Sequence, residues 1–378
     1  MNTAFKLLTD IIKNVIFGSK TAPDKNAVIE NLNGIYELAA AQDLAHIVGY
    51  YIEKNGFSLD GEPAQTLVKY KYSAIFRDER LTYTTGKTAE LFRNHNIRFI
   101  NLKGDVIKNL YPQTWLRTRC DSDILIDREN LEKAAELLEK EMGFTVTTRT
   151  DHDISLYSRS GVHIELHYTL IEDGELEKTD KILDKIWEYT ENDGCEYKLT
   201  DEAFYLYNIA HTAKHVKGGG CGIRPFIDLL LLKKNNLDNG SLLETAGLSE
   251  FERSCTKLAN VWFCGESHNE TTKLLENYIL SGNLYGSLEN RIAVSHTKHG
   301  GKTGVILSRI FMPYKTLCKK YPELEKHPYL APAYQLKRWV SCLTEGRIKA
   351  RMNEAIITTE MSAEKSADTV KLFKILGI

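Results

Sequence analysis

The sequence predicts an α+β protein in which a small mixed β-sheet lies between two helical regions of the chain. Apolar residues recur with helical spacing through the first 95 residues and again after residue 200. Between these regions, short apolar stretches alternate with polar residues and are separated by glycines, which is typical of strands. We therefore expect an N-terminal helical segment at 1–95, a sheet-containing core at 96–190 and a C-terminal helical domain at 191–378.

The composition is that of an ordinary globular protein. The chain has 378 residues, enough for two domains, and 42% of them are hydrophobic and 26% charged. A net charge of −2 argues against a strong global attraction to nucleic acid or anionic lipid. The seven cysteines have no C-x-x-C spacing, and no apolar run approaches the ~20 residues of a membrane helix. We expect a reduced, cytoplasmic protein.

The N-terminal segment is expected to act as a scaffold. Its first helix, around Phe5–Ile16, is amphipathic because charged residues interrupt the apolar positions, unlike a signal peptide. Helical spacing continues at 27–41 and 47–53. A long helix is expected from Glu62-Pro63, where proline is tolerated in the first turn, to about Phe92.

A strand, turn, helix and second strand are expected between Arg98 and Asp127. Phe99–Leu102 suits a short buried strand, and Lys103-Gly104 ends it. Helical spacing follows until Pro112 stops the helix.

The second of these strands opens with two acids. Asp121 and Asp123 are two residues apart, so their side chains share one face of a strand, while Ile124 and Ile126 occupy the other. Two adjacent carboxylates repel each other, and a divalent cation removes this conflict. Oxygen ligands suit Mg²⁺, which also keeps phosphate oxygens in its shell. The pair therefore predicts a Mg²⁺ site. The alternatives are that the two aspartates are solvated residues at a strand edge or caps at the approach to a helix.

The remainder of the core is expected to complete the sheet. Its predicted elements are a helix at 129–142 ended by Gly143, strands at 144–150, 154–158 and 162–168, and a helix at 179–189. The Arg159–Gly161 turn pairs the last two strands as a hairpin.

The strand at 162–168 carries a third acid. In G-V-H-I-E-L-H, the apolar residues face one way, and His163, Glu165 and His167 face the other. Glu165 is expected to join the two aspartates, hold the ion that activates an attacking hydroxyl and act as a base. Two ions about 3.5–4 Å apart could then share the acids. An ion pair from Glu165 to Arg117 or Arg119 is the competing interpretation. The H-x-E-x-H run also permits a zinc site.

Basic side chains near these acids are candidates for phosphate contact. A helix at 203–215 carries His211, Lys214 and His215 on one face, and either a substrate contact or a polar surface explains them. Arg117 suits a triphosphate because a guanidinium makes forked hydrogen bonds to phosphate oxygens.

Several motifs together resemble a known family. They are L-K-G at 102–104, R-T-R-C-D-S-D-I-L-I at 117–126, V-H-I-E-L-H at 162–167 and the helical stretch 208–232. This pattern resembles the uncharacterised bacterial nucleotidyltransferase family of the polymerase-β superfamily. The resemblance implies a Mg²⁺-dependent transfer of a nucleoside monophosphate from a nucleoside triphosphate (NTP), with release of pyrophosphate. The acceptor is left open among small molecules, RNA and proteins.

One departure from the superfamily concerns the phosphate-binding turn. Better-known members have Gly-Ser there, whereas this chain has Lys103-Gly104-Asp105. Phosphate is then expected to contact backbone N–H groups at the helix start and Lys103. Two other functions stay open: a non-catalytic or regulatory module of the toxin–antitoxin type, and a metal-dependent phosphohydrolase.

Two glycine motifs are rejected as nucleotide-binding signatures. Gly300–Thr303 imitates the end of a P-loop, but the pattern needs glycine where His296 stands. The glycine cluster at 218–222 follows a helix and lacks the β-α-β setting of a dinucleotide fingerprint.

Overall fold

The protein divides into two compact units. The computed structural model describes residues 2–58, 61–171, 176–238, 240–284, 286–299, 304, 307, 310–344 and 363–378. By internal contacts, one unit comprises Met1–Lys214, Ile223–Thr272 and Gly377–Ile378, and the other comprises His215–Gly222 and Lys273–Leu376. The N-terminal helices and the sheet thus share one unit.

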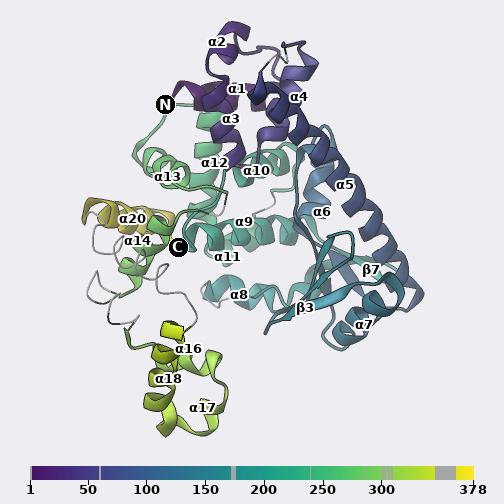
Figure 1. Ribbon diagram of the computed structural model, residues 1–378, viewed down its shortest axis with the longest axis vertical. Coiled ribbons are helices and arrows are strands. Elements are labelled where there is room, and N and C mark those ends of the chain that lie inside the picture. Colours follow the sequence, from purple (N-terminus) through teal and green to yellow (C-terminus); the bar gives the residue numbers. More distant parts are fainter. Residues whose placement is uncertain are drawn as a thin grey trace. The chain divides into compact units, whose positions relative to one another are not determined.

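Five helices precede the sheet in the first unit (Figure 1). They are α1 (Thr3–Val15), α2 (Lys25–Glu30), α3 (Leu32–Ala41), α4 (Ala45–Lys54) and α5 (Glu62–Asn94). The side chain of Asn2 caps α1 by accepting a 3.0 Å hydrogen bond from Ala4 N. The long helix expected from residue 62 is α5, with Pro63 in its first turn.

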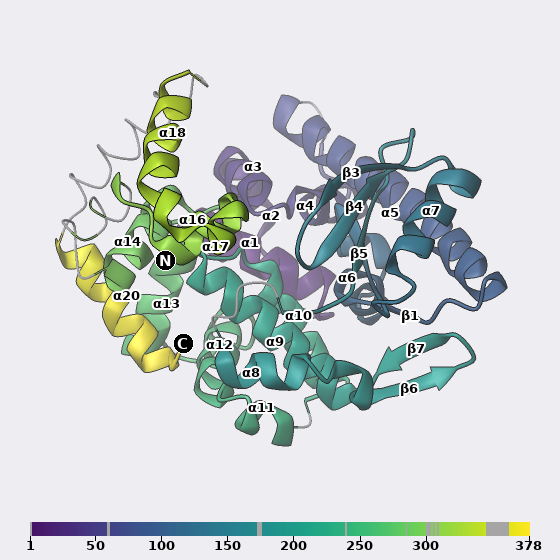
Figure 2. The ribbon, with the colours of Figure 1, turned by 90° about the horizontal axis from the view of Figure 1, so that it is seen from below.

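The sheet has seven strands in the order β3-β4-β5-β2-β1-β7-β6 and is mixed, as expected (Figure 2). β2 pairs parallel with β5 and antiparallel with β1, and β1 pairs parallel with β7. The strands are β1 (Phe99–Asn101), β2 (Asp121–Ile126), β3 (Thr145–Arg149), β4 (Asp153–Tyr157), β5 (His163–His167), β6 (Thr190–Asp193) and β7 (Glu196–Leu199). The short helices between β1 and β2 are α6 (Lys103–Ile107), η1 (Lys108–Leu110) and η2 (Thr114–Leu116).

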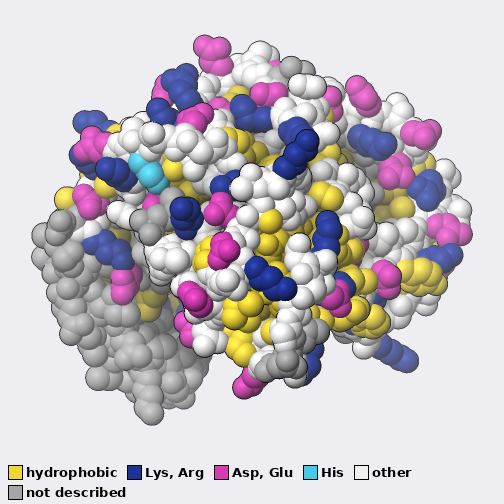
Figure 3. All heavy atoms as spheres, turned by 90° about the horizontal axis from the view of Figure 1, so that it is seen from above, with side chains coloured by type: hydrophobic (Ala, Val, Ile, Leu, Met, Phe, Trp, Pro, Cys, Tyr) yellow, Lys and Arg dark blue, Asp and Glu magenta, His cyan; other side chains and the backbone are white. Residues whose placement is uncertain are grey.

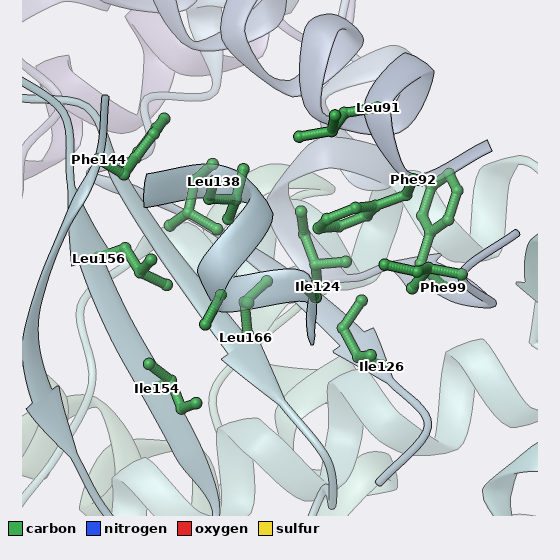
Figure 4. Packing of buried hydrophobic residues seen from close by; sticks show 14 of the residues in the cluster. Leu91, Phe92, Phe99, Ile124, Ile126, Leu138, Phe144, Ile154, Leu156 and Leu166 are labelled. Atoms are coloured by element: carbon green, nitrogen blue, oxygen red, sulfur yellow. The ribbon is translucent and has the colours of Figure 1, made fainter. Parts of the chain in front are cut away.

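One face of the sheet packs against α5 and α7 (Leu131–Met142). Figure 4 shows Phe92, Ile124 and Leu138 pointing into this core from α5, β2 and α7. Alternation along the strands places every second side chain there, so the intervening side chains face the opposite side. Gly143 ends α7 with φ of 67°, a left-handed conformation that favours glycine.

The opposite face is covered in part by helices that follow β5 in the chain. Its core joins Leu125 of β2 to Tyr207, Leu183 and Ile186. These helices and the remaining ones of the unit are α8 (Glu177–Leu183), η3 (Ile186–Tyr189), α9 (Asp201–Lys217), α10 (Arg224–Lys234), α11 (Ser241–Thr245) and α12 (Ser249–Phe263). The acidic side chains of β2 and β5 lie on this face.

The elements at the end of the core differ in detail from those expected. The region 190–199 forms a strand hairpin, β6–β7. The helix expected at 179–189 is instead α8 followed by the 3-10 turn η3. Residues 191–196 are mostly polar and exposed, so they give no apolar alternation by which to recognise a strand.

The second unit is helical. Its helices are α13 (Glu270–Leu280), α14 (Leu288–His299), α16 (Tyr314–Lys320), α17 (Glu323–Lys326), η4 (Pro328–Leu330), α18 (Ala331–Thr344) and α20 (Ala363–Leu376). Tyr278 and Phe373 pack edge to face, with ring centroids 5.8 Å apart. The Tyr278 hydroxyl donates a 2.8 Å hydrogen bond to Val216 O in the segment before the glycine cluster. Gly300–Thr303 lies outside the described residues.

The surface carries charges of both signs. On the face in Figure 3, lysine and arginine side chains are interspersed with aspartate and glutamate, in keeping with a net charge of −2. Of the helices that the structure describes, none combines the length and the apolar character needed to cross a bilayer.

Candidate metal and nucleotide site

Five polar side chains meet on the face of the sheet opposite α5. β2 and β5 run parallel with Asp121 opposite His163 and Asp123 opposite Glu165. Ligand atoms of Asp121, His163 and Glu165 lie within 4.8 Å of one another, as do those of Asp123, Glu165 and His167. The two strands thus place all three acids in one cluster. Along each strand the acidic residues alternate with apolar residues that face the core on the other side of the sheet.

The competing interpretation of Glu165 as an arginine partner is wrong. Glu165 lies between two imidazoles, with His163 Nε2 3.5 Å from one carboxylate oxygen and His167 Nε2 3.5 Å from the other. Arg117 pairs with Asp228, and Arg119 pairs with Asp78 and Asp105.

Asp123 is compensated by two cationic groups. His167 Nε2 donates to Asp123 Oδ1 at 3.0 Å, and Lys103 Nζ lies 3.7 Å from Oδ2. Burial alone would raise the pKa of Asp123, but Lys103 and then the His167 hydrogen bond lower it well below its usual range. Burial would lower the pKa of His167, but the hydrogen bonds to Asp123 and Glu165 raise it to about 9.

Asp121 is in the opposite situation. Burial, followed by repulsion from Asp123 and Glu165, raises the pKa of its carboxyl group. Within the part of the chain that the structure describes, no basic side chain forms an ion pair with Asp121. A divalent cation at this carboxylate would offset the repulsion.

The turn after β1 brings Lys103 to the acids. Lys103 has φ of 34°, a left-handed conformation that costs a non-glycine residue on the order of 1–3 kcal/mol. The N–H of Leu102 donates to Asp123 O at 3.0 Å and fixes the turn against β2. The ammonium lies 5.6 Å from the ring centroid of Tyr207 on α9.

Asp105 points away from the cluster. Its carboxylate accepts a 2.6 Å hydrogen bond from Ser122 Oγ and forms an ion pair with Arg119. Ser122 alternates with Asp121 and Asp123 and therefore lies on the other face of β2. The acid in the Lys-Gly-Asp turn is thus a structural anchor, and it does not oppose an anion at the cluster.

Arg117 is held by a buried acid. Its Nε lies 3.0 Å from Asp228 Oδ1 and its Nη2 lies 2.9 Å from Oδ2, while Tyr111 donates to Oδ1 at 2.7 Å. Its remaining nitrogen lies next to Gly104, where a Cβ atom would come within 2.7 Å of it. Glycine at this position therefore leaves room for the guanidinium.

Comparison with known sequence families decides the identity of the core. A profile described as an uncharacterised nucleotidyltransferase matches residues 30–264, a stretch that contains the whole sheet and the acid cluster. The chain belongs to this nucleotidyltransferase family. A search of curated proteins gave no match. Membership supports nucleotidyl transfer as the general chemistry and implies a nucleotide substrate.

Helix α9 of this family member adds basic groups beside the acids. His211 acts electrostatically on Asp123. Burial, and then repulsion from Lys103, lowers the pKa of Lys214 to about 8, although Glu165 opposes the shift. His215 belongs to the second compact unit, whereas the acids belong to the first.

Sequence reasoning missed three residues that position the site. Tyr207 lies beside Lys103, Asp228 holds Arg117, and Asp153 of β4 pairs in register with His167. The alternation D-I-S-L-Y in β4 could have identified Asp153, because the two apolar residues between the polar ones face the core. For Tyr207, its position one helical turn before His211 was the available signal.

The donor set of the cluster fits a hard divalent cation. The three carboxylates offer oxygen ligands, and the imidazole rings of His163 and His167 lie beside the Glu165 carboxylate. Nucleotidyltransferases commonly use divalent metals, and this family member has acids placed to hold one.

Proposed function

We propose that the protein transfers a nucleoside monophosphate from a Mg²⁺-bound NTP to an acceptor and releases pyrophosphate. The observation that carries this proposal is the pairing of Asp123 with Glu165 on adjacent parallel strands, with Asp121 two residues earlier on the same face. Family membership supports the general chemistry. The acceptor, a small molecule, RNA or protein, is left for experiment.

The three acids have separate roles in the proposed reaction. Asp121 and Asp123 would hold Mg²⁺ together with the nucleotide, and Glu165 would hold the metal on the acceptor side and take the proton of the attacking hydroxyl. A bound Mg²⁺ supplies charge neutralisation on the phosphates and lowers the pKa of an attacking hydroxyl. A bond forms between the acceptor oxygen and the α-phosphorus, and the bond to the pyrophosphate oxygen breaks.

Basic groups around the acids would orient the triphosphate. Lys103 and Gly104 occupy the turn next to Asp123, and Arg117 lies against Gly104. His211 and Lys214 add positive charge from α9. His215 joins this proposed set through its helical spacing from His211 alone. Positioning of this kind, with fixed charges, is the main source of catalysis in phosphoryl and nucleotidyl transfer.

Calorimetric titration of Mg²⁺–NTP tests the binding role of the aspartates. The double variant Asp121→Asn/Asp123→Asn is expected to lose Mg²⁺-dependent NTP binding while its thermal unfolding stays cooperative. The matched control, Asp184→Asn/Asp193→Asn, changes two exposed aspartates of the same unit and should bind as the parent does. Unchanged Mg²⁺–NTP affinity in the first variant would reject the site.

Labelling separates transfer from the two competing functions. Protein, Mg²⁺ and each α-³²P-labelled NTP are incubated with a cell extract, and the labelled fraction is identified. Transfer gives a labelled acceptor and one pyrophosphate for each label. A phosphohydrolase gives labelled nucleotide products without an acceptor, and a regulatory module binds NTP without turnover.

A further inference from the structure

The two aspartates of the cluster differ in how their charges are balanced. Both carboxylate oxygens of Asp123 are occupied, Oδ1 by His167 Nε2 at 3.0 Å and Oδ2 by Lys103 Nζ at 3.7 Å. The side chains of Asp123 and His167 are buried, with relative exposures of 10% and 6%. Asp123 thus already has positive charge on both sides.

Lys103 is fixed beside Asp123 from several directions. It follows directly on Leu102, whose N–H is hydrogen-bonded to Asp123 O at 3.0 Å. Its left-handed φ of 34° turns the chain at this residue. The ring of Tyr207 lies 5.6 Å from the ammonium, and the Lys103 side chain is only 14% exposed. These contacts keep a positive charge at one place in the cluster.

Asp121, His163 and Glu165 form the other half of the cluster. Their ligand atoms lie within 4.8 Å of one another, and all three residues are partly exposed, so an ion can reach them from solvent. The His163 ring is held by stacking on Tyr157, with centroids 4.2 Å apart and planes 6° from parallel. Among the residues that the structure describes, no cation lies in an ion pair with Asp121.

We propose that the nucleotide-free protein binds one divalent ion, at Asp121, Glu165 and His163, and that the Lys103 ammonium takes the place of a second ion at Asp123. This inference rests on the proposed function, because it concerns the same metal site. The physical reason is charge balance. Lys103 and His167 pair with Asp123, and the basic groups of α9 act on Asp123 (His211) and on Glu165 (Lys214). The least compensated carboxylate is therefore Asp121, and a second dication at Asp123 would be repelled by the Lys103 ammonium 3.7 Å away.

Mn²⁺ binding without nucleotide tests the stoichiometry. Calorimetry and paramagnetic resonance on the full chain should give one ion per chain, and Asp121→Asn should weaken binding by about tenfold or more. Two ions of similar affinity in the parent protein would overturn this inference and leave the proposed function intact. No bound Mn²⁺ at all would overturn both.

Removing the ammonium tests the role of Lys103. Lys103→Met should admit a second Mn²⁺ at Asp123, and Lys103→Met/Asp123→Asn, which removes the charge pair together, should return to one ion with nearly the parent affinity. Lys185→Met, at an exposed lysine of the same unit, is the control. A folded Lys103→Met protein that still binds one ion would overturn the proposal. Should that variant not fold, the parent stoichiometry and the double variant still decide it.

Discussion

At the scale of single residues, Glu165 is expected to separate nucleotide binding from chemistry. Asp121 and Asp123 remain available to a Mg²⁺–NTP complex when Glu165 is changed, because each contributes its own carboxylate. Glu165→Gln should therefore keep NTP affinity within about tenfold and lower turnover by about 10²–10⁴-fold, since it removes a base and a ligand. Initial rates of pyrophosphate release and calorimetry measure the two effects. Glu188→Gln, at an exposed glutamate, is the control, and equal rates in both variants would contradict the role.

His46 gives the protein a predictable response to acid. Its Nε2 lies 2.8 Å from Leu116 O in a fully buried position, and burial lowers the pKa of the ring from 6.5 to about 4. Between these values the unfolded chain binds a proton that the folded chain does not. Stability from this group is therefore complete above pH 6.5 and is lost as the pH falls toward 4, by on the order of 3 kcal/mol.

Urea unfolding at several pH values measures this loss. His46→Gln keeps a side-chain donor for Leu116 O but has no titrating ring, so its free energy of unfolding should fall less steeply between pH 7 and pH 4. Asp43 and Arg224 lie near His46 and their ion pair is present in both proteins, so the comparison isolates the loss of the imidazole. Parallel pH profiles of the parent and the variant would contradict the assignment.

Residue spacing predicted which acids share a face of the sheet, but it did not predict which residues pair with the basic side chains. The i, i+2 spacing of Asp121 and Asp123 fixes their shared face wherever the strand lies, and the alternation around Glu165 does the same. The partner of Arg117 is 111 residues away on α10. A contact between residues so far apart in the chain does not appear in a local sequence pattern. The pattern could therefore suggest that Arg117 binds phosphate, but it could not show that Asp228 binds Arg117.

At the scale of elements, Asp228 joins α10 to the loop that precedes β2. Its carboxylate accepts hydrogen bonds from Arg117 and Tyr111; Asp228 and Tyr111 are buried, and the Arg117 side chain is 12% exposed. Asp228→Asn leaves the guanidinium without its counter-charge and should reduce the free energy of unfolding by about 3 kcal/mol. Tyr111→Phe removes one neutral donor to the carboxylate and should cost about 1–2 kcal/mol. Urea unfolding measures both.

A substitution of an exposed acid is the control for these two variants. Asp184→Asn, on the first unit's surface, should change stability by less than about 0.5 kcal/mol. A loss for Asp228→Asn no larger than this would mean that the buried ion pair does not hold α10 to the loop.

Whether an element could be predicted depended on its apolar pattern. The long helix α5 and the strands β2 and β5 carry clear helical or alternating patterns, and the structure has them where they were expected. The β6–β7 hairpin does not, because its strands are short and largely exposed. It is stabilised as a strand pair by the parallel contact between β7 and β1, which is a tertiary interaction.

At the scale of the whole molecule, the fold class followed from the order of helical and alternating patterns. The division of the chain did not, because compact units are defined by contacts between distant segments. Residues 215–222 group with 273–376, whereas 223–272 group with the sheet. Sequence patterns report the period of a segment and carry no direct information about which other segment covers it.

This division predicts where a bound ligand stabilises the protein. A ligand that binds the folded state raises stability by about 2.7 kcal/mol at one hundred times its dissociation constant, and this increase applies to the cooperative unit that contains the site. The acid cluster lies in the unit with the sheet. Mg²⁺–NTP should therefore slow hydrogen exchange of amides in β2 and β5 and leave the exchange of α14 and α20 unchanged. Exchange measured by mass spectrometry on the full chain checks this. Asp121→Asn/Asp123→Asn should show no slowing, and equal protection of both units in the parent protein would show that they unfold as one.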